Sequence, residues 1–371
     1  MHALIINRGD ARWTPEGHQV HGFAMHERAL AMKLGMTYEM VAADNLADVE
    51  AALIRRPADV AFVMVSWKED PEAVTRLFRS LPEWSGRPKL VFLDYYAPAS
   101  SPFFGVLPHV DCYFKRQMYR DPSLYSKEYE GGNLFTQHVS QSLGIDLNGW
   151  TFASVPDPNH LHKLVHGWNL GVTPHYRNLL RLTGVMPLPW ERRPFAVNRR
   201  LGLSAGPRAV TEWYHHYREC WGDALESLRA EYRCTGSHRI RLRYYFAEMI
   251  LSRIGVSPFG WGEVCFRDYE VIASGALLIK PSMEHLKTSP DIYVEGKTYV
   301  AASWDASDVA DLCRYYLAHP EEAKEIIHNG QAALTKYFDQ DGFVEDVRRV
   351  LDRVGLGDLP SQTARMVPVM V

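Results

Sequence analysis

The chain has few cysteines and no surplus of basic residues. Its five cysteines are widely spaced and form no Cys-x-x-Cys pair, which argues against a disulfide framework and a zinc site. The formal net charge is −3, so a role in binding nucleic acid is disfavoured. No stretch reaches the roughly 18 apolar residues of a membrane-spanning helix, and the first ten residues lack the basic region of a leader peptide. We therefore expect a cytoplasmic protein, with peripheral membrane association left open.

The first third of the chain alternates short apolar runs with helical patterns, as expected for a parallel sheet covered by helices. Residues 3–8 and 88–96 are two of the predicted strands, and 22–35 is a predicted helix that ends at Gly35. These runs are continuously apolar rather than alternating, which indicates strands buried on both faces. Residues 120–190 are rich in proline, glycine, asparagine and aspartate, so an elaborated loop region is predicted there.

A second α/β unit is predicted after a connection at 184–194 that contains three prolines. A chain of 371 residues exceeds what one hydrophobic core usually serves. We expect two domains, residues 1–190 and 191–340, with the connection acting as a hinge. The segment 341–371 begins with an amphipathic helix that could return to the first domain.

The stretch SPFGWGEVCFRDYEVIASGALLIKP carries the clearest functional pattern. Gly260 and Gly262 lack a Cβ, so the backbone there can approach a ligand closely. A helix that starts near Glu263 would direct its free N–H groups at the same loop, an arrangement that binds phosphate. Arg267 and Glu270 would project from the same side of that helix as Glu263. The arginine suits a pyrophosphate, and Glu270 could accept two hydrogen bonds from a ribose diol.

The same three charged side chains have a simpler interpretation. Residues at this spacing could form a solvated helix face with ion pairs, and for an arbitrary helix that outcome is favoured. Two features favour the ligand interpretation here. The glycine pair directly precedes the helix, and the helix lies between two predicted strands, where open sheets bind ligands at the carboxyl ends of their strands.

The stretch FRDYEVIASGALLIKP and the following YVEGKTYVAASWDASDVADLCRYYLAHPEEAKEIIHNGQAALTKYF resemble the C-terminal, donor-binding half of GT-B glycosyltransferases. The likeness is greatest to family-1-like and exostosin-like bacterial members and covers roughly residues 195–340. It implies two Rossmann-like domains with an interdomain cleft, a nucleoside-diphosphate sugar as donor substrate, no further cofactor, and catalysis without a metal. By the same resemblance Glu270 binds the ribose, and Arg199 or Arg200 in FAVNRRLG reaches the pyrophosphate.

The sequence also departs from that family pattern. Many retaining members carry two glutamates eight positions apart, whereas Glu263 and Glu270 are seven apart. The glycine-rich entry loop common in the first domain is missing, and NRGDARWTPEGHQVHG stands in its place.

Candidate groups for the chemistry lie at the ends of predicted first-domain strands. An inverting reaction would need a general base, for which His18, His21 and Asp94 are the candidates. Each histidine could equally be a surface or packing residue, and a retaining reaction needs no such base. Arg218 and the arginines of SHRIRLR are further candidates for phosphate contacts, although alternating basic residues more often form a solvated helix face.

The sequence thus predicts a glycosyltransferase that moves a sugar from a nucleoside diphosphate to an acceptor hydroxyl, in the synthesis of a surface polysaccharide or glycoconjugate. The acceptor would be a glycan or a lipid-linked glycan. Two alternatives remain: a nucleotide-sugar epimerase of the same fold, and a non-catalytic protein that binds nucleotide or glycan.

Overall fold

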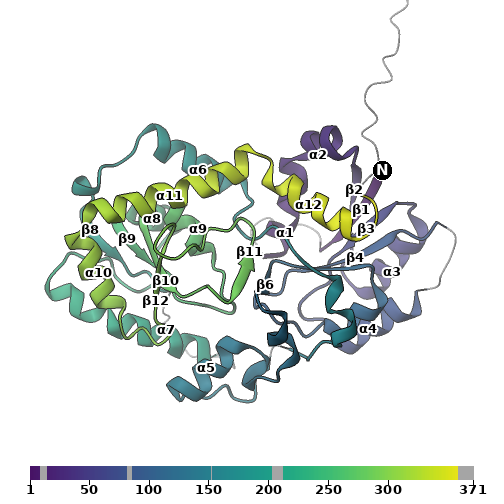
Figure 1. Cartoon of the computed structure of the whole chain (residues 1–371), viewed down its shortest axis with the longest axis horizontal. Helices are drawn as coiled ribbons and strands as arrows, with labels where there is room; N and C mark the ends of the chain where they lie inside the picture. Colours follow the sequence, from purple (N-terminus) through teal and green to yellow (C-terminus); the bar gives the residue numbers. More distant parts are fainter. Residues whose placement is uncertain (9–14, 82–85, 152, 203–211, 358–371) are drawn as a thin grey trace, which may run out of the picture.

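The computed structural model describes residues 1–8, 15–81, 86–151, 153–202 and 212–357. Within these residues the chain forms two parallel β-sheets, each flanked by helices, in two domains placed side by side (Figure 1). The larger sheet has the strand order β2-β1-β3-β4-β5-β7, and the smaller has β12-β10-β9-β8. The predicted α/β class with two Rossmann-like domains is confirmed.

The first sheet consists of β1 (His2–Asn7), β2 (Thr37–Ala42), β3 (Val60–Val63), β4 (Lys89–Asp94), β5 (Cys112–Lys115) and β7 (Leu164–His166). The α-helices of this part are α1 (Pro15–Met25), α2 (Glu27–Leu34), α3 (Leu46–Arg55), α4 (Pro71–Ser80) and α5 (Leu134–Leu143). The second sheet consists of β8 (Phe195–Asn198), β9 (Ser252–Val256), β10 (Leu277–Pro281) and β12 (Val300–Ala302). Its α-helices are α6 (Pro174–Val185), α7 (Glu212–Ala224), α8 (Leu242–Ile250), α9 (Phe266–Ala273), α10 (Val309–Ala318) and α11 (Pro320–Asp339). Short 3-10 helices complete the described chain: η1 (Phe104–His109), η2 (Pro122–Ser126), η3 (Glu130–Gly132), η4 (Pro158–Lys163), η5 (Trp190–Arg192) and η6 (Glu226–Ala230).

Local sequence signals explain where several helices begin and end. The side chain of Asn45 accepts a hydrogen bond from the Asp48 N–H and caps α3, and Asp70 caps α4 in the same way. Gly35 ends α2 in the left-handed conformation, which glycine adopts at little cost. The helix expected over 22–35 is in fact divided between two helices, α1 and α2, because the helical conformation is interrupted at His26.

The region from 120 to 190 is more regular than its composition indicated. It contains α5, β7 and α6 in addition to 3-10 turns, so the prediction of an elaborated loop was wrong for these parts. The helix α6 packs against α9 and α11 of the second unit. Buried Arg193 donates hydrogen bonds to the carbonyls of Leu188 and Ser252, so the segment after α6 is also fixed to the second sheet.

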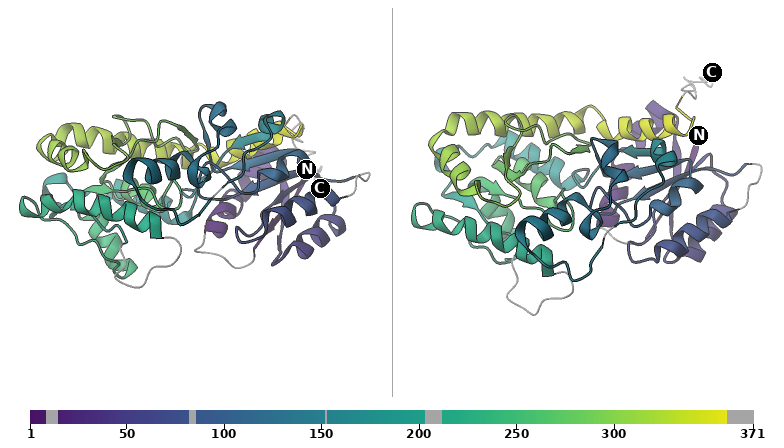
Figure 2. Two further views of the ribbon diagram at one scale, coloured as in Figure 1. Left: turned by 90° about the horizontal axis from the view of Figure 1, so that it is seen from below. Right: turned by 60° about the horizontal axis from the view of Figure 1, so that its bottom comes forward.

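Two further connections join the domains. The strands β6 (Gln117–Tyr119) and β11 (Leu286–Thr288) pair antiparallel, one contributed from each side of the molecule. The chain runs along α11 of the second domain and then crosses to the first domain, where α12 (Gly342–Arg353) packs against α2 and β7 (Figures 1 and 2). Phe343 lies in the core of the first domain, with its ring centroid 4.8 Å from that of Trp168.

Candidate functional site

A cavity of about 500 Å³ lies where the carboxyl ends of the two sheets face each other. From the second sheet, Arg200 follows β8 and the loop from Ser257 to Cys265 follows β9. From the first sheet, Ala97 follows β4 and Arg116 follows β5. Ligands of parallel α/β sheets bind at this end of the strands, so the position fits a binding site.

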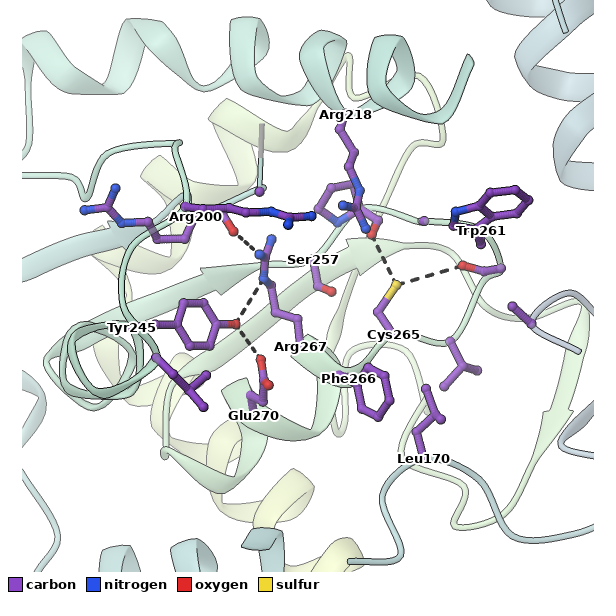
Figure 3. A pocket seen from close by; sticks show the side chains of 18 of the residues that line it. Leu170, Arg200, Arg218, Tyr245, Ser257, Trp261, Cys265, Phe266, Arg267 and Glu270 are labelled. Carbon is purple, nitrogen blue, oxygen red and sulfur yellow. Dashed lines mark hydrogen bonds between the residues drawn. The ribbon is translucent and has the colours of Figure 1, made fainter. Parts of the chain in front are cut away.

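Four arginines of the second domain line the cavity, and the contacts of Arg200, Arg218 and Arg267 hold these three in place (Figure 3). Arg267 on α9 hydrogen-bonds the hydroxyl of Tyr245 and the carbonyl of Arg200. Arg218 on α7 donates to the carbonyls of Leu201 and Phe259, 3.4 Å in each case. The Arg200 guanidinium instead forms a two-point contact with Glu248, at 2.7 and 2.8 Å.

The cavity therefore carries an excess of positive charge. Arg218, Arg239 and Arg267 line it, and in the described part of the chain none of them forms an ion pair with a carboxylate. Among the described residues that line the cavity, Glu270 is the one acidic side chain. Positive groups in a partly enclosed, low-dielectric site attract an anion strongly, so phosphate groups are the ligand chemistry that these residues fit.

Tyr245 connects the arginine and the glutamate of α9 (Figure 3). Its hydroxyl donates to Oε2 of Glu270 at 2.5 Å and accepts from Nε of Arg267 at 3.4 Å. Burial raises the pKa of the Glu270 carboxyl, while the hydrogen bond from Tyr245 and the charge of Arg267 act in the opposite direction. The i, i+3 spacing thus places Arg267 and Glu270 on the same side of the helix, as predicted from the sequence.

The start of α9 is fixed by a buried polar network. The carboxylate of Asp268 accepts hydrogen bonds from the Cys265 N–H at 2.9 Å, the Ser257 hydroxyl at 2.5 Å and the Tyr293 hydroxyl at 2.7 Å. It also lies 3.2 Å from the ammonium of Lys280, and both charged side chains are fully buried. Because Cys265 and Ser257 belong to the cavity lining, this network sets the shape of the loop between them.

Glu263 does not lie on the helix, which corrects the sequence expectation. The helix begins at Phe266, and the fully buried Glu263 side chain enters the first domain. There it accepts hydrogen bonds from Nδ2 of Asn133 at 3.2 Å and from the Ala99 N–H at 3.3 Å. Burial raises the pKa of its carboxyl. Glu263 is absent from the cavity lining, and its contacts dock the loop onto the first domain.

The other predicted donor-side residues divide into two groups. Arg200, Arg218, Gly260 and Gly262 line the same cavity as Arg267 and Glu270. Arg199 does not line it, because its guanidinium is buried beside β8 and pairs with Glu226 at 2.6 Å.

None of the three proposed bases lines the cavity. Asp94 is buried within the first domain, where it accepts hydrogen bonds from Nζ of Lys115 at 3.0 Å and the Tyr113 hydroxyl at 2.8 Å. The buried His18 is nearer, with its ring centroid 4.7 Å from that of Phe266 in the cavity wall. Burial lowers the pKa of His18 to about 4, and the charges of neighbouring His21 and Arg116 act in the same direction. His21 lies beside it, with ring centroids 5.1 Å apart.

Sequence reasoning missed Tyr245, Arg116 and Trp261, which also line the cavity. Tyr245 lies on α8, and its partners Arg267 and Glu270 lie on α9, so no local spacing relates them. In the described residues, no group of three or more histidine, cysteine or acidic side chains is arranged to hold a metal ion. None of the described helices combines the length and the apolar character that crossing a bilayer requires.

The comparisons with known proteins agree with the resemblance seen in the sequence. Residues 208–347 match a protein family described as glycosyl transferase-like. No curated protein matches the chain.

Solved structures match it over nearly its whole length. The trehalose-phosphate synthase of E. coli, bound with UDP-2-fluoro glucose, has a TM-score of 0.52 and 10% identity, over 98% of this chain and 100% of that one. Sucrose-phosphate synthase from Thermosynechococcus elongatus has a TM-score of 0.51 and 9% identity, over 96% and 99%. An alpha-glucosyltransferase in complex with UDP has a TM-score of 0.50 and 9% identity, over 94% and 99%. At such low identity these likenesses establish the GT-B fold, and the resemblance to GT-B glycosyltransferases is confirmed.

Proposed function

We propose that this protein is a glycosyltransferase that moves a sugar from a nucleoside diphosphate to an acceptor hydroxyl. The observation that carries the proposal is the cationic cavity between the two domains, where Glu270 is the one carboxylate among the described residues that line it. The cavity wall from Arg218 to Glu270 belongs to the segment that matches the glycosyl transferase-like family. Two proteins of the same fold were solved with UDP or UDP-2-fluoro glucose, which supports the same class of donor here.

In this proposal the arginines bind the pyrophosphate of the donor. Arg218 and Arg267 approach it from α7 and α9, and the glycine loop around Gly260 brings the backbone close. During transfer the acceptor oxygen forms a bond to the anomeric carbon, and the bond from that carbon to the phosphate oxygen breaks with its electrons going to the nucleoside diphosphate. The fixed guanidinium groups stabilise the charge that develops on this leaving group, the task that a divalent ion performs in other enzymes.

In an inverting reaction, a general base must take the proton from the hydroxyl of the sugar acceptor. Of the three predicted bases, His18 is the first to test because it touches the cavity wall through Phe266, whereas Asp94 is engaged by Lys115. A pKa near 4 keeps the His18 imidazole unprotonated at neutral pH, as a base must be, but also makes it a weak base. For the sugar acceptor we keep the prediction from the sequence, which is a glycan or a lipid-linked glycan.

Replacing Glu270 by alanine should weaken nucleotide binding by roughly ten- to a hundredfold, because the hydrogen bonds from a ribose diol to a charged group are lost. Isothermal titration calorimetry with UDP, GDP, dTDP and CMP measures this loss of affinity. It also shows which nucleobase the donor carries. Glu325→Ala is the matched control, since Glu325 is exposed on α11. Equal affinities of Glu270→Ala and wild type, at unchanged melting temperature, would contradict the assignment of the ribose site.

Donor turnover separates transfer from the alternatives. A glycosyltransferase should release nucleoside diphosphate at a rate that depends on added acceptor. An epimerase would instead form a new nucleotide sugar without any acceptor, and a non-catalytic protein would bind the nucleotide without turnover. Liquid chromatography of the reaction mixture with and without a candidate glycan distinguishes the three outcomes.

A further inference from the structure

An exposed basic and apolar segment borders the cavity. It comprises residues 238–244 (His-Arg-Ile-Arg-Leu-Arg-Tyr), which enter and begin α8. Leu242 is 64% exposed and Tyr244 is 52% exposed. Arg239, Arg241 and Arg243 are all exposed as well. Two large exposed side chains, Leu242 and Tyr244, that alternate with arginines form a surface that is both positive and apolar.

The charges of this segment are not balanced by acidic groups. No aspartate or glutamate occurs from residue 232 to residue 247. In the described part of the chain the three arginines form no ion pair with a carboxylate, and Glu248, the nearest acidic residue in sequence, is engaged by Arg200. Arg243 instead donates to the Tyr244 hydroxyl at 2.9 Å and lies over its ring, 4.7 Å from the centroid.

The segment is continuous with the proposed donor site. Arg239, Ile240 and Leu242 line the cavity, whereas Arg241, Arg243 and Tyr244 do not. A binding partner that contacted Arg241, Arg243 and Tyr244 would therefore lie beside the cavity.

We propose that residues 238–244 bind the surface of an anionic phospholipid bilayer and so hold the cavity next to a membrane. Arg241 and Arg243 would meet the phosphates of the headgroups, while Leu242 and Tyr244 would enter the interfacial region. A bilayer is favoured over a soluble polyanion because only a bilayer gains from burying the two apolar side chains. The attachment is peripheral, consistent with the lack of a spanning helix in the described residues. Membrane attachment next to the cavity would favour a lipid-linked acceptor. That consequence rests on the proposed function, whereas the binding of residues 238–244 to the bilayer does not.

Vesicle sedimentation with the full-length protein tests the proposal. Wild type should sediment with phosphatidylcholine vesicles that contain phosphatidylglycerol, should not sediment with pure phosphatidylcholine, and should be released by raised salt. The variant Arg241→Gln/Arg243→Gln/Tyr244→Ser should bind at least about thirtyfold more weakly, since each of the two arginines contributes roughly 1 kcal/mol near an anionic surface and the loss of the Tyr244 ring adds to this. Arg76→Gln/Arg79→Gln removes the same charge from exposed positions of α4 and should bind as wild type does.

Nucleotide binding by the same variants separates this proposal from the proposed function. The triple variant keeps every residue that lines the cavity, so its affinity for the nucleotide should be unchanged, which also shows that it is folded. Equal sedimentation of the triple variant and wild type, or no sedimentation of wild type with anionic vesicles, would overturn the membrane proposal. Retention on a soluble anionic polysaccharide, with vesicle binding insensitive to Tyr244→Ser, would also overturn it and indicate a polyanion site.

Discussion

Replacing Asp268 by asparagine should lower the free energy of unfolding by about 3–5 kcal/mol, because it leaves the ammonium of Lys280 buried without its partner. Both side chains are fully buried, 3.2 Å apart, and the other neighbours of Lys280 include the rings of Phe259 and Tyr293. Asparagine keeps one oxygen that can accept from Cys265, but it places an amide donor where the other carboxylate oxygen now accepts from the Ser257 hydroxyl. Urea unfolding followed by tryptophan fluorescence measures the loss.

A second substitution tests this cause. In the Asp268→Asn background, Lys280→Met removes the unpaired charge and should restore part of the lost stability, as replacing both members of a buried ion pair often does. Nucleotide binding should be weaker than in wild type in both the single and the double variant, because Asp268 also fixes Cys265 and Ser257 in the cavity lining. A loss below about 1 kcal/mol for Asp268→Asn would mean that the Lys280 charge is accommodated without it.

The parts of the site that depend on local spacing could be predicted from the sequence. Arg267 and Glu270 share one side of a helix because they are three residues apart, and Gly260 and Gly262 lie in the loop before it. The predicted start of that helix was three residues early. Glycine and glutamate at 262 and 263 looked like a helix N-terminus, but the capping residue is Cys265, which is an uncommon cap, supported by Asp268.

The parts that depend on long-range packing could not be predicted. Tyr245 contacts Glu270 across 25 residues, and Glu263 contacts Asn133 across 130 residues, so neither pair leaves a periodic pattern in the sequence. Asp94 was correctly placed at the end of a buried strand, but the Lys115 ammonium on the next strand holds its carboxylate inside the domain. A position at a strand end therefore predicts proximity to the cleft and not the direction of the side chain.

The loop that Glu263 anchors should be sensitive to the smallest addition of volume. A Cβ at Gly262 would lie 2.2 Å from the carbonyl oxygen of Ala97 and 2.3 Å from its carbon, and these backbone atoms cannot rotate away. Gly262→Ala should therefore push the loop off the first domain. Because the same loop lines the cavity, kcat/KM for the donor should fall on the order of a hundredfold, the effect expected of a displacement of about 1 Å at a site of reaction.

The control for this prediction is Gly184→Ala at the end of α6, where an added Cβ meets no atom within 4 Å. This variant should match wild type in turnover, with a melting temperature equal to or slightly above that of wild type because alanine favours the helix. If Gly262→Ala also retains wild-type turnover, the contact between Gly262 and Ala97 is not needed for activity, and the domains work at a wider separation. If turnover falls while nucleotide affinity is kept, the second domain binds the donor by itself, and contact with the first domain is needed for the transfer step.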